Sequence, residues 1–347
     1  MENLTTSIVL ALIGGALIGV SSSLNYILFG KITGLSGYLF RVFSLKFDPI
    51  YSSTFCFIIG LITAVDTYYR LIGSTLYGLA LVDTESSFNP ILIVIGSFLV
   101  GFGVRWGGGC TSGHGVCGLP RLSIRSFIAV PTFMASGIVT ASLLNLLGPI
   151  APQVSIPSSV LTPYSYFPII LLHLSQAAAL SSILYTLFTE KTIIKRLAPL
   201  IYLSTGLTFG LGLLISGMCS RSKILNFLTI SSNWDPSLIF VMCSAVAINF
   251  ITFQLVMRRN RAVFSDTIDL PDKHIDKGIF FGPIVFGIGW GTTGFCPGPA
   301  LANITVLSFG VVMVVFIFSG QLLFDYLDEK FTQQSSQKEK LLVSPNS

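Results

Sequence analysis

Long apolar runs follow one another along almost the whole chain, separated by short polar or glycine-rich segments. A helix needs about 20 apolar residues to cross the hydrocarbon core of a bilayer, with a range of roughly 17–25. The pattern therefore predicts an all-α polytopic membrane protein with about nine spans, at residues 6–29, 50–65, 90–106, 126–148, 166–188, 197–218, 237–257, 279–295 and 300–324. Residues 68–82 are either an interfacial helix or part of a longer, broken second span.

Composition agrees with this class of protein. Of the 347 residues, 52% are hydrophobic and 10% are charged, whereas a soluble domain has about 25% charged residues. We interpret residues 1–324 as one membrane domain and the polar residues 325–347 as a disordered tail. No basic stretch precedes the first apolar run, which continues past residue 20, so it is interpreted as a span and not as a cleaved signal.

Lysine and arginine predict the orientation, because basic loops stay on the cytoplasmic side. They concentrate in the loops 30–49, 107–125, 189–196 and 258–278. With nine spans, this places the N-terminus outside a cell membrane and the C-terminus in the cytoplasm. The loop 219–236 is the exception, and we interpret it as partly re-entrant. Basic residues do not alternate with aromatic ones as in a nucleic-acid binder, and the sequence has no Walker motif, nucleophile elbow or paired-carboxylate site.

Four glycine-rich segments predict an internal repeat, at residues 15–37, 96–118, 206–220 and 282–300. In three of them a cysteine follows a glycine by seven residues: Gly103 and Cys110, Gly212 and Cys219, Gly289 and Cys296. The predicted halves are residues 6–148 and 197–324, with the span 166–188 between them. Each half has four spans and returns to its starting side, so the extra span inverts the second half. This arrangement is an inverted repeat with its axis in the membrane plane.

The cysteines at these glycine-rich segments are the main candidates for chemistry. Glycine runs let a helix open, and non-helical backbone at membrane depth is tolerated only where it is buried or lines a cavity. A thiol at the start of a short helix then lies where the helix dipole favours anions. The competing interpretation is that the glycines only allow close helix packing. The backbone positions that we expect to shape these helix ends are Gly109, Thr111, Gly113, Gly294 and Gly298.

Several other side chains are weaker candidates for a substrate path. Aligning residues 30–34 with residues 109–113 puts Lys31 at the position of Cys110, where it attracts an anion or is only a positive charge at a span end. Arg105 either anchors a span at the interface or faces the path.

The remaining cysteines and histidines are interpreted either as groups near the path or as packing residues. Cys110, His114 and Cys117 have soft ligand atoms, but their spacing is not that of structural zinc, so His114 is interpreted as a hydrogen-bonding group near the path. Cys56 and Cys243 lie in apolar runs and are interpreted as packing residues. His173 lies within a predicted span, and we expect it to pack there.

The longest motifs resemble one known family. They are GGGCTSGHGVCGLPRLSIRS (107–126), GLTFGLGLLISGMCSRSKILNFL (206–228) followed by NWDPSLIFVM (233–242), and FGIGWGTTGFCPGPAL (286–301). Together they resemble the YeeE/YedE family of sulfur-compound transporters, and the match covers about residues 10–320. This chain resembles two separate bacterial halves joined by the span 166–188.

The resemblance implies a fold and a function. The implied fold is a helical membrane protein with inverted halves and re-entrant helical hairpins that meet near mid-membrane. The implied function is uptake of thiosulfate or a related sulfur anion, handed along by cysteine thiols, for which Cys110 and Cys296 are the best matches and Cys219 is next. Lys31 departs from longer members of the family, which have a cysteine in the first repeat. A soluble sulfurtransferase is a partner that only the resemblance suggests.

Two alternatives to thiosulfate transport stay open. One is the same architecture with another cargo, such as a selenium compound, sulfite or a sulfide-level species. The other is a membrane sulfurtransferase that carries sulfur as a persulfide on Cys110 or Cys296, activated by His114 or Lys31. We expect a transporter that needs no cofactor or metal, with the bilayer and a small inorganic sulfur anion as its partners.

Overall fold

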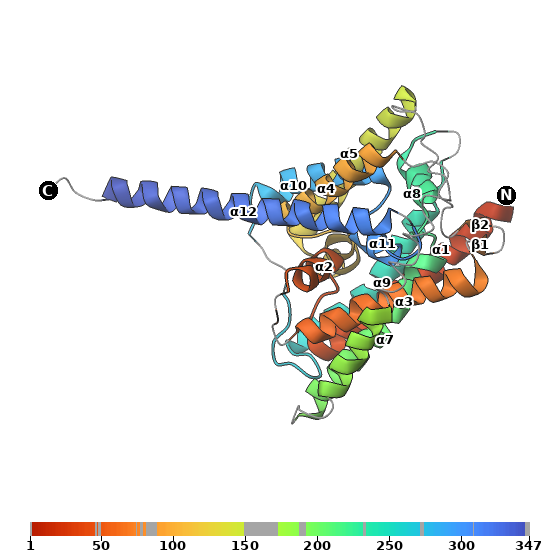
Figure 1. The fold of residues 1–347 in the computed structure, drawn as a ribbon, viewed down its shortest axis with the longest axis horizontal. Coiled ribbons are helices and arrows are strands. Elements are labelled where there is room, and N and C mark those ends of the chain that lie inside the picture. Colours follow the sequence, from red (N-terminus) through yellow and green to blue (C-terminus); the bar gives the residue numbers. More distant parts are fainter. Residues whose placement is uncertain are drawn as a thin grey trace.

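The computed structural model describes residues 2–45, 47, 50–73, 75–76, 79–80, 89–148, 173–186, 192–231, 234–270, 274–307 and 309–343. Helices make up nearly all of the regular structure in this part of the chain (Figure 1). Two short strands, β1 (Thr75–Leu76) and β2 (Leu79–Ala80), pair antiparallel, with Thr75 opposite Ala80. The predicted fold class, an all-α polytopic membrane protein, is confirmed.

One three-helix unit occurs four times along the chain. Each unit has a long helix, a break, a short helix and a second long helix. The units are α1 (Glu2–Phe29), α2 (Leu35–Phe43) and α3 (Tyr51–Ile72); α4 (Pro90–Trp106), η1 (Thr111–Gly118) and α5 (Ile124–Leu147); α7 (Ile193–Ile215), α8 (Arg221–Leu228) and α9 (Ser237–Arg259); and α10 (Gly278–Thr293), α11 (Pro297–Ala302) and α12 (Gly310–Val343).

A glycine in the left-handed region of backbone space breaks the chain at the same point of every unit. Gly30 has φ +69°, and Gly108, Gly217 and Gly294 each have φ +75°. Residues with a side chain rarely adopt this conformation, and glycine adopts it without a steric penalty. The glycine-rich segments therefore determine where each long helix ends and its short helix can begin.

The long helices form two groups in which the halves exchange partners. In one group α1 packs against α7 and α9, while α3 packs against α7. In the other, α10 packs against α4 and α5, while α12 packs against α4. The first helix of a unit in one half thus contacts the first and last helices of the matching unit in the other half. A two-fold relation between the halves pairs these contacts: α1 with α9 corresponds to α7 with α3, and α10 with α5 corresponds to α4 with α12.

The first helices of matching units cross antiparallel. On α1, Gly14 lies against Ser216 of α7, and further along Ser21 donates its hydroxyl to the carbonyl of Thr205 at 2.7 Å. Residue numbers therefore rise along one helix as they fall along the other, and the same is true of α4 and α10. A two-fold axis relating two such neighbours is perpendicular to both of them. For helices that cross a membrane, this is the geometry of an inverted repeat.

The predicted count of nine spans is not confirmed. Among the described residues six helices are long and apolar enough to cross a membrane, or seven if α4 and η1, bent by 47°, count as one. The predicted span 300–324 is in fact α11 followed by α12, which begins only at Gly310. The second span runs on to Ile72, so residues 68–72 belong to α3.

The predicted linker span 166–188 is only partly described. Residues 173–186 are helical and pack against α3, where the Gln176 amide donates to the Thr63 hydroxyl at 3.0 Å. Ala179 and Ile183 pack beside Cys56, which confirms Cys56 as a buried packing residue. His173, at the start of this helix, is exposed, contrary to the expectation that it packs within a span.

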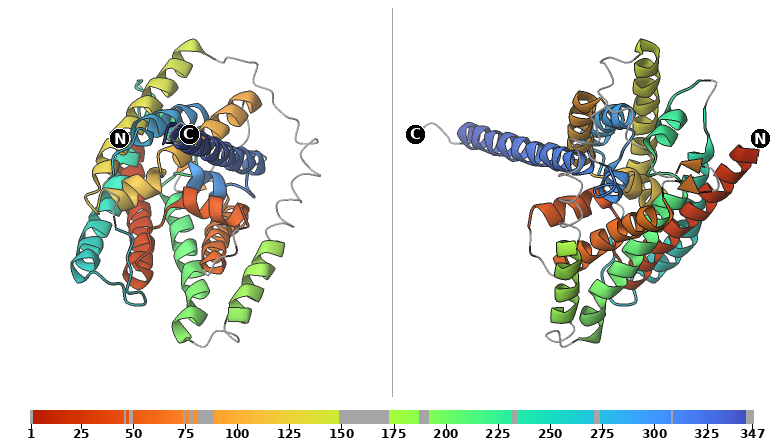
Figure 2. Two further views of the ribbon diagram at one scale, coloured as in Figure 1. Left: turned by 90° about the vertical axis from the view of Figure 1, so that its left-hand side faces the viewer. Right: turned by 45° about the vertical axis from the view of Figure 1, so that its right-hand side comes forward.

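The described part of the polar tail that starts at residue 325 is helical, because α12 continues to Val343. Figures 1 and 2 show this helix projecting beyond the rest of the bundle. The segment contains many strong helix formers, and residues 321–343 include no glycine or proline that would end the helix. Asp325 also pairs with Arg105, which ties the start of the polar segment to α4.

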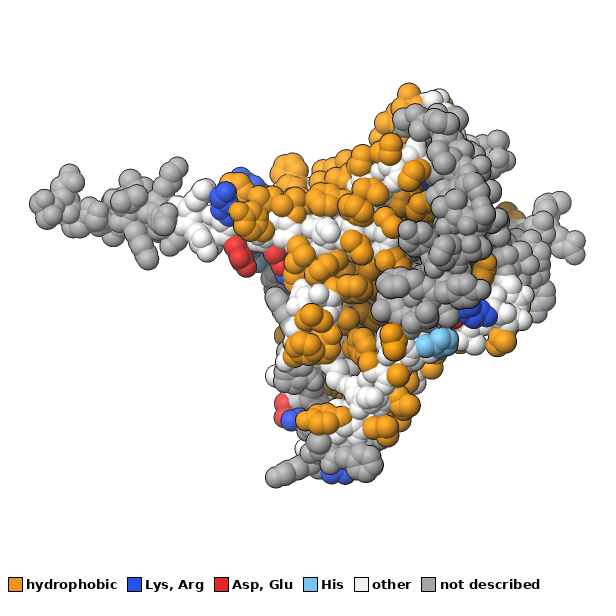
Figure 3. All heavy atoms as spheres, viewed as in Figure 1, with side chains coloured by type: hydrophobic (Ala, Val, Ile, Leu, Met, Phe, Trp, Pro, Cys, Tyr) orange, Lys and Arg blue, Asp and Glu red, His pale blue; other side chains and the backbone are white. Residues whose placement is uncertain are grey.

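Hydrophobic side chains cover most of the described surface in the view of Figure 3, as expected of helices that face lipid. Charged side chains are sparse on this face and lie toward its edges, including the end where α12 leaves the bundle.

Candidate functional site

The short helices of all four units converge on one region. The backbone N–H of Leu35, at the start of α2, donates to the hydroxyl of Ser112 in η1 at 3.1 Å. The Leu35 side chain also lies against Gly298 of α11. The Asn303 amide at the end of α11 donates to the carbonyl of Cys219, just before α8, at 3.0 Å. The breaks in the long helices therefore create a single central region.

Two of the predicted thiols lie at this centre. Cys110 and Cys296 directly precede η1 and α11, and they are 1% and 3% exposed. The hydroxyl of Thr111 donates to the Cys296 sulfur at 3.3 Å, and the Cys110 sulfur lies 3.2 Å from the Ser112 hydroxyl. Thr111 and Ser112 thus connect the two thiols across the halves of the protein.

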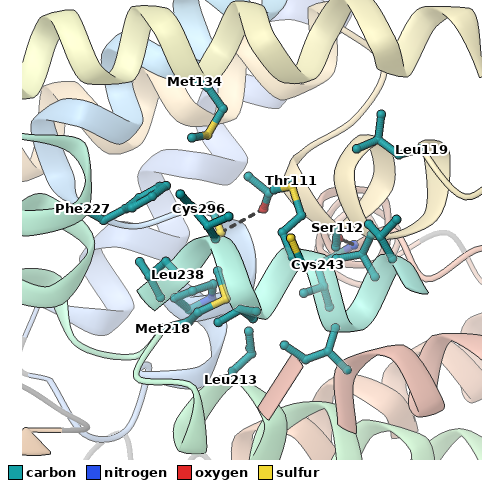
Figure 4. Close-up of a pocket in the computed structure, with 18 of the residues that line it drawn as sticks. Thr111, Ser112, Leu119, Met134, Leu213, Met218, Phe227, Leu238, Cys243 and Cys296 are labelled. Carbon is teal, nitrogen blue, oxygen red and sulfur yellow. Dashed lines mark hydrogen bonds between the residues drawn. The ribbon is translucent and has the colours of Figure 1, made fainter. Parts of the chain in front are cut away.

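On one side of these thiols is a cavity of about 340 Å³ with many sulfur atoms in its wall. We call it the sulfur cavity. Its sulfur-bearing side chains are Met134, Met218, Met242, Cys243 and Cys296. Figure 4 shows the labelled Cys296 beside Thr111, with Met134 and Met218 on different sides of the space.

Apolar side chains form most of the remaining wall of the sulfur cavity, with Phe209 and Phe227 among the largest. Thr111 and Ser112 are polar exceptions. Trp290 also lines it, and its buried indole N–H has no hydrogen-bond partner among the described residues.

Two more polar cavities are lined by neither Cys110 nor Cys296, and Cys110 lines none of the three. The arginine cavity, of about 260 Å³, is lined by Arg41, Arg105, Gly109 and Gly113, among others. The lysine cavity, of about 220 Å³, contains Lys31. Because Gly109 and Gly113 line the arginine cavity while Thr111 and Ser112 line the sulfur cavity, the segment around Cys110 separates the two.

The predicted cations in these polar cavities are both paired. Arg105 forms a two-pronged ion pair with Asp325, with its Nη2 atom 2.8 Å from Oδ2, and it lies over the Phe40 ring at 4.2 Å. The ammonium of Lys31 lies 2.8 Å from a carboxylate oxygen of Asp269. Both side chains are about one-third exposed, so these pairs hold weakly and are screened by salt.

Lys31 does not replace a cysteine of the other units. Counted from the left-handed glycine, Cys110, Cys219 and Cys296 each stand two positions later, where the first unit has Ile32. The break before α2 is also longer, because α2 begins five residues after Gly30.

His114 and Cys117 lie outside the described cavities. The two ring nitrogens of His114 lie 3.1 Å from the Ser126 hydroxyl and 3.2 Å from the Gly107 carbonyl, so His114 connects the break to the start of α5. The Cys117 thiol is buried against Tyr26 and donates to the Thr33 carbonyl at 3.8 Å. Cys219 is fully buried and also lines none of the described cavities.

No group of three histidine, cysteine, aspartate or glutamate side chains that could hold a metal ion occurs in the described part of the chain. The remaining backbone candidates shape the breaks. A Cβ atom at Gly109 would meet the His114 ring at 2.9 Å, and one at Gly298 would meet Leu35 at 2.6 Å. Gly294 has the positive φ already described, and the Cβ position of Gly113 is open.

Replacing His114 by alanine should lower the stability of the protein by about 1–3 kcal/mol, the cost of leaving a buried polar group without its partner. The reason is that the change removes the side chain that joins Gly107 to Ser126. Thermal unfolding of the purified protein in detergent measures this effect. His173→Ala is the matched control, because His173 is exposed and bonds only locally to Gln176. Equal melting temperatures for the two variants would show that the His114 connection between Gly107 and Ser126 does not stabilise the protein.

Sequence reasoning missed several residues of the cavities. Methionines in an apolar span look like packing residues, and Cys243 was predicted to be one, yet they line the sulfur cavity. Arg41, Asp269 and Gln321, which line the arginine cavity, were not singled out. Their positions depend on how distant helices pack, and no local motif carries that information.

The re-entrant short helices, the inverted halves and the buried central thiols together define the class of protein as a polytopic membrane protein of transporter architecture. Comparison with known proteins gives the family. Residues 1–140 match the model of the family described as sulphur transport. Residues 197–337 match a second model, described as a family of unknown function.

Relatives in Xylella fastidiosa are named probable transporters. One from strain Temecula1 is 41% identical over 126 residues, which are 35% of this chain and 85% of the relative. Another from the same strain is 34% identical over 135 residues, which are 39% of this chain and 93% of the relative. The chain belongs to this sulphur transport family, the YeeE/YedE family, with both family models matched in one chain.

Proposed function

We propose that the protein carries thiosulfate or a closely related sulfur anion across the membrane. The path runs from the sulfur cavity past Cys296 and Cys110 into the arginine cavity. The observation that carries this proposal is the position of Cys296 in the wall of the sulfur cavity, hydrogen-bonded to a segment around Cys110 whose Gly109 and Gly113 line the arginine cavity. The sulphur transport family and the relatives named as transporters support the class of function.

The chemistry of the two cavities fits such an anion. Thiosulfate has a soft, polarisable terminal sulfur and three hard oxygens. Methionine and cysteine sulfur atoms are themselves polarisable, so the sulfur cavity favours the soft end of the anion over a fully oxygenated one. The Cys296 thiol and the Trp290 N–H, which has no partner among the described residues, supply neutral donors. Such donors bind an anion without holding it as firmly as a buried arginine, and conduction needs sites that release their ion.

The long-range electrostatics also favour an anion. The start of α2, at Leu35, meets the first turn of η1, at Ser112. Helix N-termini carry partial positive charge and unpaired N–H groups, which transporters use to bind anionic groups near mid-membrane. Arg41 and Arg105 also line the arginine cavity, although the charge of Arg105 is largely balanced by Asp325.

Persulfide transfer is the second candidate, and the geometry supports it less well. A nucleophilic thiol needs a base or a cation beside it. The hydrogen-bonding neighbours of Cys110 and Cys296 are the hydroxyls of Ser112 and Thr111. His114 bonds to Ser126 and Gly107, and Lys31 pairs with Asp269. Slow alkylation of both thiols, without a covalent sulfur adduct, is the result expected of a transport path.

The orientation follows from the basic residues at one end of the bundle. Lys31, Arg41, Arg105 and Arg125 all contribute to the region around the arginine and lysine cavities or the loop beside it. By the positive-inside rule this end faces the cytoplasm of the cell, which places the N-terminus outside. A soluble sulfurtransferase that receives the anion would then meet it here.

Cells that lack their own thiosulfate carriers should take up radiolabelled thiosulfate when they produce this protein. A tenfold excess of unlabelled thiosulfate should suppress the signal, whereas the same excess of sulfate should leave most of it, because sulfate lacks the soft sulfur. Absence of uptake with folded protein in the membrane would reject thiosulfate as the cargo. Equal competition by sulfate would contradict the role of the sulfur cavity in selection.

A further inference from the structure

The loop between α9 and α10 folds back onto the break that precedes α2, and its backbone is fixed there at Asp269. The Asp269 N–H donates to the Gly30 carbonyl at 2.7 Å. The Asp269 carbonyl accepts from Arg121 at 2.8 Å and from the Tyr26 hydroxyl at 3.2 Å. These three bonds do not involve the carboxylate, so they position the residue whatever its side chain does.

The Asp269 carboxylate occupies a site made for an anion. One oxygen lies 2.8 Å from the Lys31 ammonium, and the other lies 3.3 Å from the backbone N–H of Ile32. A cation next to a free backbone N–H is a common way to bind a small oxyanion. The side chains of Lys31 and Asp269 are 35% and 33% exposed, so water and ions reach the pair.

The position of Asp269 relates this pair to the path. Asp269 lines both the arginine cavity, which reaches Gly109 beside Cys110, and the lysine cavity, which lies farther from the thiols. Ile32, Tyr38 and Arg41 line both cavities as well. Asp269 is therefore one of four residues at the border between the two cavities, and it is the acidic one.

We propose that Lys31 and the Ile32 N–H form an anion site at this mouth of the path, which the Asp269 carboxylate fills as a tethered substitute for the transported anion. With Asp269 in place the charge of Lys31 is cancelled and this anion site is occupied. An arriving anion takes the site by displacing the carboxylate, which swings away while the backbone bonds hold the loop. This inference rests on the proposed function, because it assigns the site to the same anion path.

The weakness of the pair makes displacement feasible. An exposed ion pair contributes little to stability, so the carboxylate is easily exchanged for another anion. A carboxylate held by buried partners would be too costly to displace, and the site would stay closed to other anions. We call the Lys31–Asp269 pair the gate. Asp269 comes from the second half of the chain and Lys31 from the first, so the gate connects the two halves at one end of the path.

The variant Asp269→Asn tests the gate, because it keeps the size of the side chain and the backbone bonds and removes the charge. Asp276→Asn is the matched control. Asp276 belongs to the same loop and pairs with Arg125 at 3.1 Å, but it lines none of the described cavities.

The first readout is modification of Cys110 by a negatively charged methanethiosulfonate reagent in a variant that retains Cys110 as its only cysteine. Asp269→Asn should speed modification about fivefold from the face that carries Lys31, the change expected when an exposed ion pair is lost. Adding Lys31→Met should remove the gain, and Asp276→Asn should show none. An unchanged rate in Asp269→Asn would overturn the gate.

The second readout uses the protein with all its cysteines and needs no transport. Sodium thiosulfate should raise the melting temperature of Asp269→Asn more than that of the wild type, and Lys31→Met should abolish the difference. Equal shifts in all variants would overturn the anion site. If the wild type takes up no thiosulfate but both readouts give the expected results, thiosulfate is excluded as the cargo and the gate is still supported.

Discussion

Replacing Cys296 by alanine should reduce thiosulfate uptake by roughly 10–100-fold, which corresponds to the loss of one hydrogen bond to a charged group. Cys296 is the predicted thiol that lines the sulfur cavity, and its sulfur accepts the Thr111 hydroxyl at 3.3 Å. Without the thiol, an anion leaving the sulfur cavity loses a donor at the point where the two halves meet. Uptake of radiolabelled thiosulfate at matched membrane levels of protein measures the effect.

Two further variants separate donor chemistry from mere burial. Cys296→Ser keeps a donor and should retain part of the uptake, while Cys110→Ala should lose it as Cys296→Ala does. Cys56→Ala is the control, because Cys56 is equally buried but packs between α3 and residues 173–186, away from the thiols. Uptake that survives both Cys110→Ala and Cys296→Ala would keep the transporter and discard the role of the thiols.

The repeated break was predictable from the sequence because one residue type dictates it. Glycine adopts positive φ cheaply, so the three glycine-rich segments with a cysteine predicted an opened backbone. The structure has a left-handed glycine at each of them and a fourth, Gly30, in the first segment. The number of spans was less predictable. Hydropathy treats residues 300–324 as one apolar run, although Pro297–Ala302 is a separate short helix. A short helix that ends inside the protein is as apolar as a span.

The candidate site was predictable only where local motifs create it. Cys110 and Cys296 were found by their spacing, and their hydrogen-bonded connection through Thr111 follows from the inverted halves. The partners of Arg105 and Lys31 were not found, because Asp325 and Asp269 lie 220 and 238 residues away along the chain. Both aspartates occur in polar segments that hydropathy assigns to a tail and a loop. Only the packing of α12 and of the loop after α9 brings them to the cavities.

A methyl group added at Gly101 should prevent α4 from packing against α12. A Cβ atom at this position would overlap the carbonyl oxygen of Ile317, which is backbone and cannot rotate away. The two helices would have to separate along their whole contact, and overpacking of this kind costs about 3 kcal/mol. Gly101→Ala should therefore lower the yield of monodisperse protein in detergent and its melting temperature.

Gly37→Ala is the matched control for this prediction. Its added Cβ would meet nothing within 4 Å, and Gly37 lies within α2, where alanine is favoured over glycine by roughly 0.5–1 kcal/mol. The two glycine-to-alanine changes should thus shift the melting temperature in opposite directions. Equal stability of the two variants would show that α4 and α12 do not approach this closely. The distance between these helices matters for function as well. Arg105 on α4 lines the arginine cavity, and Asp325 on α12 is its ion-pair partner.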